Sequence, residues 1–243
     1  MLQKAIPRYL RVYSALKSRI ESAAFKSGDL LPPEPALEQM FKVSRTTVRK
    51  AVEMLAREGM VYVRQGRGTE VLDFRATQKL QFVTSFSETL REQGFRVGYR
   101  SVAVRFVAAP IAVASELSLP AGERVARVAR IALANGRPIA LMTNYLRADI
   151  VPGIEKAADR LGSLYFFLES EYGLVIEAAT DYLTAKSASP LEARTLRVSA
   201  KTPLLVVRRV TFSGGRPVEV ALLKIVAERY EYCVHTKDRP PRS

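Results

Sequence analysis

Residues 43–55 read VSRTTVRKAVEML and predict an amphipathic helix around which the first part of the chain is organised. At 3.6 residues per turn, one side of this helix collects mainly apolar residues and the other side collects basic ones. The first side holds Thr47, Val48, Ala51, Val52, Met54 and Leu55, and the second holds Arg45, Thr46, Arg49 and Lys50. Ser44 precedes the helix, where its hydroxyl can cap a first-turn amide. A basic face at a helix start suits the major groove of DNA, although a solvated surface helix would carry the same pattern.

Two further helices are predicted before this one. Apolar residues recur at helical spacing between Pro7 and Ala24, which indicates an amphipathic helix. Gly28 and the prolines after it interrupt regular structure, and a short helix is expected from Glu34 to Phe41. A short helix joined by a tight turn to a helix with exposed basic residues is the pattern of a helix-turn-helix.

A β-hairpin is predicted directly after the helix-turn-helix. Gly59 suits the end of the helix, and residues 60–64 and 70–74 read as two short strands. The turn between the strands consists of Gln65, Gly66, Arg67, Gly68 and Thr69. Its glycines bend the backbone and Arg67 stands at the tip. Beside a recognition helix, such a basic hairpin is typical of a wing that reaches the minor groove or the phosphates; alone, it would be a plain turn with an exposed arginine.

Composition narrows the class of protein. The 243 residues carry a net charge of +14, divided as +6 in residues 1–75 and +8 in the rest, so a polyanionic partner is expected but not located. One cysteine and one histidine exclude an intrachain disulfide and argue against a Cys/His zinc site or a Ser-His-Asp triad. No apolar run has the length of a membrane span and no signal-peptide pattern opens the chain, so we expect a cytoplasmic protein.

The polar stretch 73–80 separates this region from a second half of different texture. Ser85 and Ser189 each begin a capping-box pattern, and short helices are also expected at 110–117 and 163–172. Strands are predicted at 97–107, 124–134, 139–146, 175–185, 204–212, 218–226 and 230–234, with tight turns at 135–136 and 213–217. Hairpin-connected strands with inserted helices indicate an α+β fold on an antiparallel sheet.

No motif for chemistry accompanies this second half. We find no nucleotide-binding glycine loop, metal-ligand cluster or nucleophile elbow, so no catalytic residue, cofactor or metal is expected. A DNA-binding domain joined to such a domain indicates a one-component regulator, in which a bound small molecule changes DNA affinity through linkage.

The first half resembles the DNA-binding domain of the GntR family of bacterial transcription regulators. The resemblance rests on Gly28-Asp-Leu-Leu-Pro, Glu34, Leu37, the VSRTTVRKA run, Leu55, Glu58-Gly59 and the Gln65-Gly-Arg-Gly wing. It implies DNA contacts by Glu34, Ser44, Arg45, Thr46, Thr47, Arg49, Lys50, Gln65, Gly66, Arg67, Gly68 and Thr69. The family usually has a DNA-contacting arginine after Glu34, where this chain has Pro35, and Pro33 replaces a small residue. More of the specificity should therefore rest on Arg45, Arg49 and the wing.

The second half resembles the effector-binding UTRA domain, which marks the HutC subfamily and has a fold similar to chorismate lyase. The segments VTSFSETLREQG, ARIALANGRPIAL, LGSLYFFLESEYG, TPLLVVRRVTFSGGRPVEVA and ERYEY carry this resemblance. It implies an effector pocket lined by Ser85, Phe86, Ser87, Arg130, Ser163, Tyr165, Glu219 and Tyr230. Hydroxyls and a guanidinium suit a phosphate, sulfate or carboxylate, and the glutamate and tyrosine suit sugar hydroxyls or an amine. Each of these residues could instead be an ordinary core or surface residue.

Two departures from the subfamily bear on the ligand. Ala132 stands where a second arginine is common, and Met142 where a glutamate is common. With one arginine fewer, a dianionic phosphate would be held less strongly. We therefore expect an anionic or polar metabolite, and this class is not restricted to sugar phosphates.

Together these features predict a homodimeric repressor of an inverted-repeat operator, released by a sugar phosphate, amino sugar, amino-acid catabolite or related anion. The expected domains are a winged helix-turn-helix at 1–74, a linker at 75–80, an effector-binding and dimerisation domain at 81–236, and a basic tail at 237–243. Two rivals remain: an enzyme of lyase-like fold fused to a DNA-binding domain, and a nonspecific DNA binder suggested by the charge. An activator role is also open.

Overall fold

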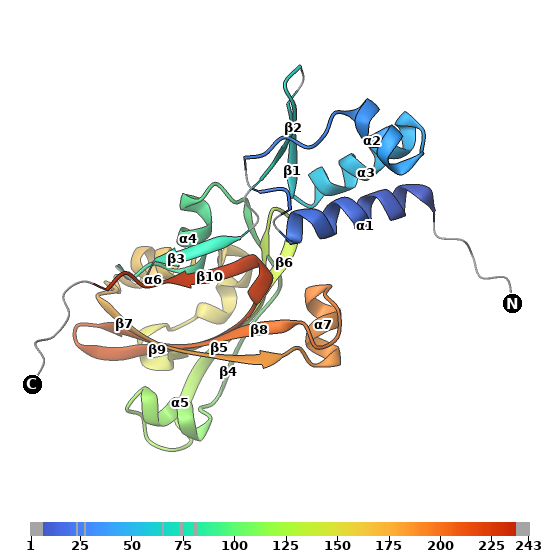
Figure 1. Cartoon of the computed structure of the whole chain (residues 1–243). Coiled ribbons are helices and arrows are strands. Elements are labelled where there is room, and N and C mark those ends of the chain that lie inside the picture. Colours follow the sequence, from blue (N-terminus) through green and yellow to red (C-terminus); the bar gives the residue numbers. More distant parts are fainter. Residues whose placement is uncertain are drawn as a thin grey trace, which may run out of the picture. The chain divides into compact units, whose positions relative to one another are not determined.

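The computed structural model describes residues 7–22, 24–26, 28–64, 66–72, 75–79 and 82–236, and it divides the chain into two units. The division near the predicted boundary falls between Arg75 and Ala76, and residues 135–137 are also grouped with the first unit. Figure 1 shows residues before this division in blue and cyan and those after it from turquoise to red. The predicted tail at 237–243 lies outside the described residues.

Three helices build the first unit, as predicted. They are α1 (Arg8–Glu21), α2 (Glu34–Phe41) and α3 (Arg45–Arg57). On α3, Val48, Ala51, Val52 and Leu55 are buried against Leu16 of α1 and Leu37 of α2, in a core that also contains Val61 and Val71. The apolar side expected from the 3.6-residue period therefore faces the core, which leaves the basic side of α3 for solvent or a partner.

The ends of α3 only partly follow the prediction. Gly59 takes the left-handed conformation (φ 68°), and the amide of Met60 donates to the Leu55 carbonyl at 3.0 Å, which closes the helix as expected. At the other end, Ser44 is the N-cap residue, but its side chain makes no capping hydrogen bond. Its hydroxyl instead lies 3.0 Å from that of Thr47, so the predicted side-chain cap is wrong.

A small antiparallel sheet forms the wing. Strand β1 (Val61–Arg64) pairs with β2 (Gly68–Val71), and Arg64 lies opposite Gly68. The segment before α2 adds a third line of backbone: the Leu31 amide donates to Thr69 at 2.8 Å, and the Val71 amide donates to Asp29 at 2.8 Å. These bonds attach the base of the wing to the helix-turn-helix, and the tip projects beyond them (Figure 1).

The second unit is built on a six-stranded sheet of order β4-β5-β6-β9-β8-β7 among its described residues. The strands are β4 (Val97–Ala108), β5 (Arg124–Ala134), β6 (Arg137–Arg147), β7 (Ala178–Ser187), β8 (Pro203–Ser213) and β9 (Arg216–Val226). The predicted hairpins at 135–136 and 213–217 join β5 to β6 and β8 to β9. The domain is therefore α+β, as the sequence indicated.

A further strand corrects the predicted linker. Residues 76–79, expected to lie in a linker at 75–80, form β3 (Ala76–Lys79), which pairs in parallel with β10 (Tyr230–Cys233). Ala76 and Gln78 are buried, so β3 belongs to the second unit. Its partner lies about 150 residues away in the chain, and such a nonlocal pairing leaves no local periodicity to detect.

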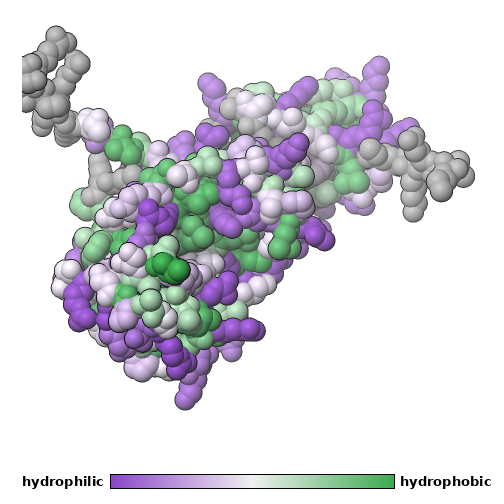
Figure 2. All heavy atoms as spheres, turned by 90° about the horizontal axis from the view of Figure 1, so that it is seen from below, coloured by the Kyte–Doolittle hydropathy of each residue, from purple (hydrophilic) through white to green (hydrophobic). Residues whose placement is uncertain are grey.

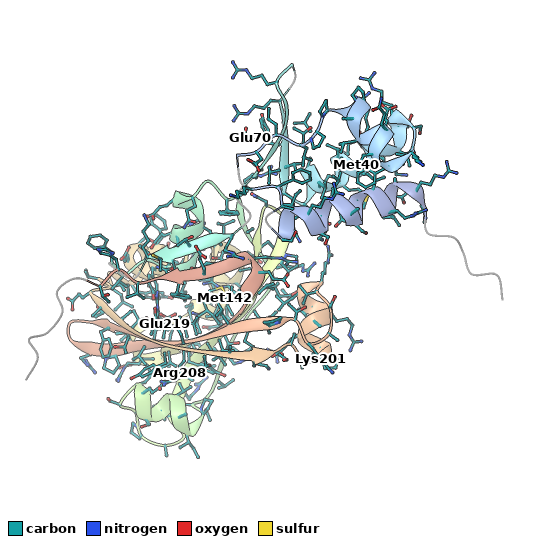
Figure 3. All side chains as sticks on the ribbon, in the orientation of Figure 1. Met40, Glu70, Met142, Lys201, Arg208 and Glu219 are labelled. Carbon is teal, nitrogen blue, oxygen red and sulfur yellow. The ribbon has the colours of Figure 1, made fainter. Side chains whose placement is uncertain are left out.

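Helices cover both faces of the sheet. On one face, β3, β10 and α4 (Phe86–Glu92) pack on Ala132, Val207 and Leu223, and α6 (Leu164–Tyr172) packs on Ala126 and Val128. On the other face lie α5 (Ile111–Glu116) and α7 (Pro190–Leu196), where Arg208 of β8 pairs with Glu116 (Figure 3). Three 3₁₀ helices, Ala148–Ile150, Ile154–Arg160 and Ala227–Arg229, complete the described elements.

Local sequence signals explain the helix starts of this unit. Ser85 before α4 and Ser189 before α7 both form complete capping boxes, with Glu88 and Glu192 returning the bond to the serine amides. The described part of the chain contains no helix long and apolar enough to cross a membrane. Hydrophilic residues are spread over the visible face in Figure 2, with hydrophobic residues between them.

Candidate DNA-binding surface and ligand pocket

The basic side of α3 is exposed and held by one carboxylate. The side chains of Arg45 and Arg49 are 70% and 62% exposed. Arg45 Nε donates to Oε2 of Glu34 at 2.8 Å, and Arg49 Nε lies 3.6 Å from Oε1 of the same residue. Glu34 begins α2, so it ties the two helices together at the end where the arginines emerge. The pKa of Arg45 is raised by this hydrogen bond and by the charge of Glu34.

The other predicted DNA-contacting residues lie around these arginines with one difference. Ser44 and Thr46 are exposed and Thr47 is half-buried. The Lys50 ammonium lies 4.1 Å from the centre of the Tyr9 ring of α1, which gives this lysine an intramolecular cation–π partner. Lys50 therefore faces α1, unlike the two arginines.

The wing supplies a second exposed group. Gly66, Arg67 and Gly68 are exposed at its tip, and both glycines have positive φ (75° and 110°), a conformation that the turn requires. Thr69 is half-buried, and its carbonyl accepts from Leu31. Gln65, the remaining predicted contact, lies outside the described residues. Pro35, where the family has an arginine, lies in the first turn of α2, where a missing amide proton costs nothing.

A pocket in the second unit gathers most of the other predicted site residues. It lies between the sheet and the layer formed by α4, α6, β3 and β10. Seven of the eight predicted residues line it: Ser85, Phe86, Ser87, Arg130, Tyr165, Glu219 and Tyr230. Ser163, the eighth, is the N-cap of α6, and its hydroxyl lies 3.4 Å from that of Ser85. Sequence positions from 85 to 230 thus converge on one place.

The pocket is narrow. Its cavity volume is about 30 Å³, well below the usual range for small-molecule sites. A ligand of more than a few atoms must therefore be slender or flat, or must move side chains apart.

Acceptor atoms dominate one end of the pocket. Glu219 is 1% exposed, and its two carboxylate oxygens accept hydrogen bonds from Asn144 Nδ2 at 2.6 Å and from the Thr211 hydroxyl at 2.8 Å. The Thr211 proton is thereby used, so the Tyr165 hydroxyl, 3.0 Å away, must donate to Thr211. Burial raises the pKa of Tyr165, and the charge of Glu219 adds to this effect, which keeps the phenol protonated. Figure 3 labels Glu219 and its pocket neighbour Met142, which lie on the adjacent strands β9 and β6.

Donor groups dominate the other end. Arg130 is 4% exposed, donates from Nη1 to the Gly162 carbonyl at 2.9 Å, and lies with its guanidinium 4.3 Å from the centre of the Tyr99 ring. Burial lowers the pKa of Arg130, while Tyr99 and Glu219 raise it, and an arginine in a protein keeps its charge. The hydroxyls of Ser85 and Ser87, 3.2 Å apart, come from the start of α4. The end is thus cationic and rich in donors.

Apolar and aromatic side chains also line the pocket. Phe86 stacks on Tyr230 with ring centres 5.0 Å apart, and Met142, Leu164 and Leu223 also line the pocket. A site with few polar groups on an apolar wall is typical of small-molecule recognition.

Five polar lining residues among those described were not predicted from the sequence: Gln78, Tyr99, Asn144, Arg209 and Tyr232. Gln78 accepts from the hydroxyls of Thr89 at 2.8 Å and Tyr230 at 2.9 Å, which fixes β3 to α4 and β10. Arg209 is held by Asp181 through two hydrogen bonds of 2.6 and 2.7 Å. The sequence did contain a signal for Arg209. Side chains alternate between the two faces of a strand, so one residue of the pair Arg208-Arg209 must point to each face of the sheet.

No group of three or more metal-ligating side chains occurs among the described residues. The buried carboxylate of the pocket is held by two neutral hydrogen-bond donors.

A winged helix-turn-helix with exposed arginines, followed by an α+β domain with a small polar pocket, defines a DNA-binding transcription regulator with a ligand-binding domain. Comparison with known proteins agrees. Residues 8–71 match the bacterial regulatory proteins of the gntR family, and residues 92–231 match the UTRA domain. The chain belongs to the GntR family, in its UTRA-containing HutC subfamily, and is a regulator rather than an enzyme.

Relatives match this chain over most of their length. The HTH-type transcriptional repressor NagR of Bacillus subtilis is 28% identical over 98% of this chain and 97% of its own. The HTH-type transcriptional regulator Rv0792c of Mycobacterium tuberculosis is 31% identical over 95% of this chain and 86% of its own. The crystal structure of PhnF from Mycobacterium smegmatis covers 94% of this chain with 26% identity and a TM-score of 0.64.

Proposed function

We propose that this chain is a homodimeric transcriptional repressor whose operator affinity falls when a small polar or anionic metabolite binds in the pocket of the second unit. The observation that supports the proposal is a pair of candidate sites, each formed by residues of its own unit. One is the exposed arginine pair of α3 held by Glu34, and the other is the buried pocket around Arg130 and Glu219. A protein that only coated DNA would have no use for the second.

In this proposal α3 enters the major groove, where Arg45 and Arg49 read guanine edges or clamp phosphates, and Arg67 of the wing reaches the neighbouring minor groove. Two copies related by a two-fold axis read the halves of an inverted repeat about 10 bp apart. The repressor NagR, similar over nearly the whole chain, supports repression rather than activation.

The test begins with the full-length protein and a pool of fragments from its own genome. Repeated selection should enrich fragments that share one inverted repeat, and footprinting should protect both halves of it. We expect the enriched site to be bound at least ~10³-fold more tightly than random DNA at physiological salt. Equal affinity for random DNA would show a nonspecific binder, and transcription rising upon binding at the enriched promoter would show an activator.

A further inference from the structure

The strongest unexplained feature of the molecule is a set of three buried polar atoms without partners. Among the described residues, the buried side-chain atoms that make no hydrogen bond are Tyr99 Oη, Arg130 Nε and Asn144 Oδ1. All three residues line the pocket of the second unit. A buried polar group without a hydrogen-bond partner is unfavourable, so three of them in one place indicate a site built for a ligand's own polar groups.

The hydrogen bonds around Glu219 determine what Asn144 offers. Since the carboxylate accepts through both oxygens, the group 2.6 Å from it must be the amide nitrogen of Asn144. The amide oxygen is then left as an unpaired acceptor beside a carboxylate. The Tyr165 hydroxyl donates to Thr211, so toward a ligand it too can only accept. This end requires a ligand group that donates several hydrogen bonds.

Counting charges shows what the ligand carries overall. The charged residues that line the pocket are Arg130, Arg209 and Glu219. Arg209 is neutralised by its two hydrogen bonds to Asp181. Arg130 and Glu219 remain, one positive and one negative. Neither forms an ion pair within 4 Å among the described residues, and the charge of Glu219 acts on Arg130 from a longer distance. The pocket is therefore bipolar and close to neutral.

A ligand with only negative charge fits this pocket badly. A phosphate monoester would bring about two negative charges to one buried guanidinium and would leave Glu219 facing an anion without compensation. A ligand with one cationic and one anionic group satisfies both ends and leaves no uncompensated charge. The narrow space and the apolar wall of Met142, Leu164 and Leu223 suit a short carbon skeleton between them.

From this geometry we infer that the effector is a compact zwitterion: a protonated amine that donates to Asn144 and Glu219, joined through a short apolar body to a carboxylate that accepts from Arg130 Nε. Tyr99 Oη, whose ring centre lies 4.3 Å from the guanidinium carbon of Arg130, donates its proton to the same carboxylate. The inference rests on the proposed function, because it names the ligand class of the same pocket. It separates amino acids and their breakdown products from sugar phosphates.

The experiment measures thermal shift and calorimetric binding of the full-length protein with probes of matched shape. The zwitterions are glycine, β-alanine, γ-aminobutyrate, ε-aminocaproate and meta-(aminomethyl)benzoate. Butyrate, benzoate, butylamine, benzylamine and glycerol phosphate are their singly charged or dianionic counterparts. We expect at least one zwitterion to bind while its matched acid and amine bind roughly 10- to 100-fold more weakly, as loss of a charged hydrogen-bond partner predicts. Absence of binding by every zwitterion, or tighter binding by glycerol phosphate, would overturn the inference.

Variants locate the binding. Glu219→Gln should weaken binding of the zwitterion but not of its matched acid, which loses a repelling charge, whereas Arg130→Met should weaken binding of both. Glu228→Gln and Arg105→Met replace exposed residues of the same domain and should change neither. Equal binding of the zwitterion to wild type and Glu219→Gln would contradict the inference.

The same probes separate this inference from the proposed function. Each binding probe is added to the complex of the protein with its selected DNA fragment. A zwitterion that binds without altering DNA affinity would leave the ligand class intact and refute the regulatory mechanism. A dianion that binds and causes the protein to release the DNA would support the regulatory mechanism and refute the zwitterionic ligand class.

Discussion

Glu34 Oε2 accepts a hydrogen bond from Arg45 Nε at 2.8 Å, which joins the first residue of α2 to the first residue of α3. The bond occupies the Nε edge of the guanidinium and leaves its terminal nitrogens for a partner. The same carboxylate lies 3.6 Å from Arg49 Nε. One acidic residue thus orients both arginines of the candidate recognition surface. It also places a negative charge where nonspecific phosphate binding would be strongest.

Replacing this carboxylate should therefore reduce specificity more than affinity. In Glu34→Ala the arginines lose their orientation, so we expect operator affinity to fall roughly 3- to 10-fold. Affinity for scrambled DNA should stay equal or rise, because a repelling charge is gone. Fluorescence anisotropy with both DNAs measures the ratio, and Glu38→Ala, on the same helix, is the control. An unchanged ratio would show that Glu34 has no orienting role.

The arginines themselves should carry base readout. Arg45→Ala and Arg49→Ala should each weaken operator binding roughly 10- to 100-fold, as expected for loss of a bidentate contact to a base. Arg57→Ala, exposed at the other end of α3, should have little effect. Titration of the selected operator with each variant gives the comparison. Operator affinity unchanged in both the Arg45 and Arg49 variants would remove α3 from the DNA interface.

Local signals predicted several helices and a hairpin of this chain, because these elements have markers of their own. Gly59 closes α3, Ser85 and Ser189 cap α4 and α7, and the turn at 135–136 joins β5 to β6. Ser44 was expected to cap α3 and does not, because its hydroxyl turns to Thr47 instead. A preferred residue at a cap position makes the bond available without ensuring it.

The pocket was only partly visible in the sequence. Resemblance to a family supplied Arg130 and Glu219, but Tyr99 and Asn144 follow no motif and become evident only when strands are paired and a carboxylate fixes an amide. Gln78 lay in the supposed linker, because β3 finds its partner at the far end of the chain. The pairing of distant strands and the direction of a hydrogen bond are properties of the folded state. Local sequence patterns therefore do not predict them.

The buried ion pair beside the pocket should be important for stability. Arg209 and Asp181 are directly opposite on β8 and β7, with side chains only 10% and 8% exposed, and Arg209 also donates to the Thr84 carbonyl at 2.7 Å. Asp181→Asn leaves a buried guanidinium without its counter-charge, so we expect a loss of about 3–5 kcal/mol in unfolding free energy. Urea unfolding followed by circular dichroism measures it.

An exposed pair provides the comparison for that variant. Asp149 forms a salt bridge of 3.0 Å with Arg147, but its side chain is 55% exposed, and solvent screens such pairs. Asp149→Asn should therefore cost less than about 1 kcal/mol. A similar cost for the two variants would mean that burial does not strengthen the Arg209–Asp181 interaction.

Glu192 should make the stability of the second domain depend on pH at the acidic end. Burial alone would raise its pKa, but hydrogen bonds from Lys224 at 2.7 Å and Lys186 at 2.9 Å outweigh burial and lower the pKa to about 2. The folded-state pKa lies below the unfolded value near 4.5, so this stabilisation is complete above that value and disappears as the pH falls toward 2. Glu192→Gln, which can keep the capping box, should cost roughly 1–3 kcal/mol at neutral pH. Urea unfolding at a series of pH values should show that the difference in unfolding free energy between wild type and variant becomes smaller below about pH 4.5. The control Glu169→Gln, which replaces an exposed residue, should show no such difference at any pH. A gap that stays constant down to pH 3 would mean that the charge of Glu192 is not its source.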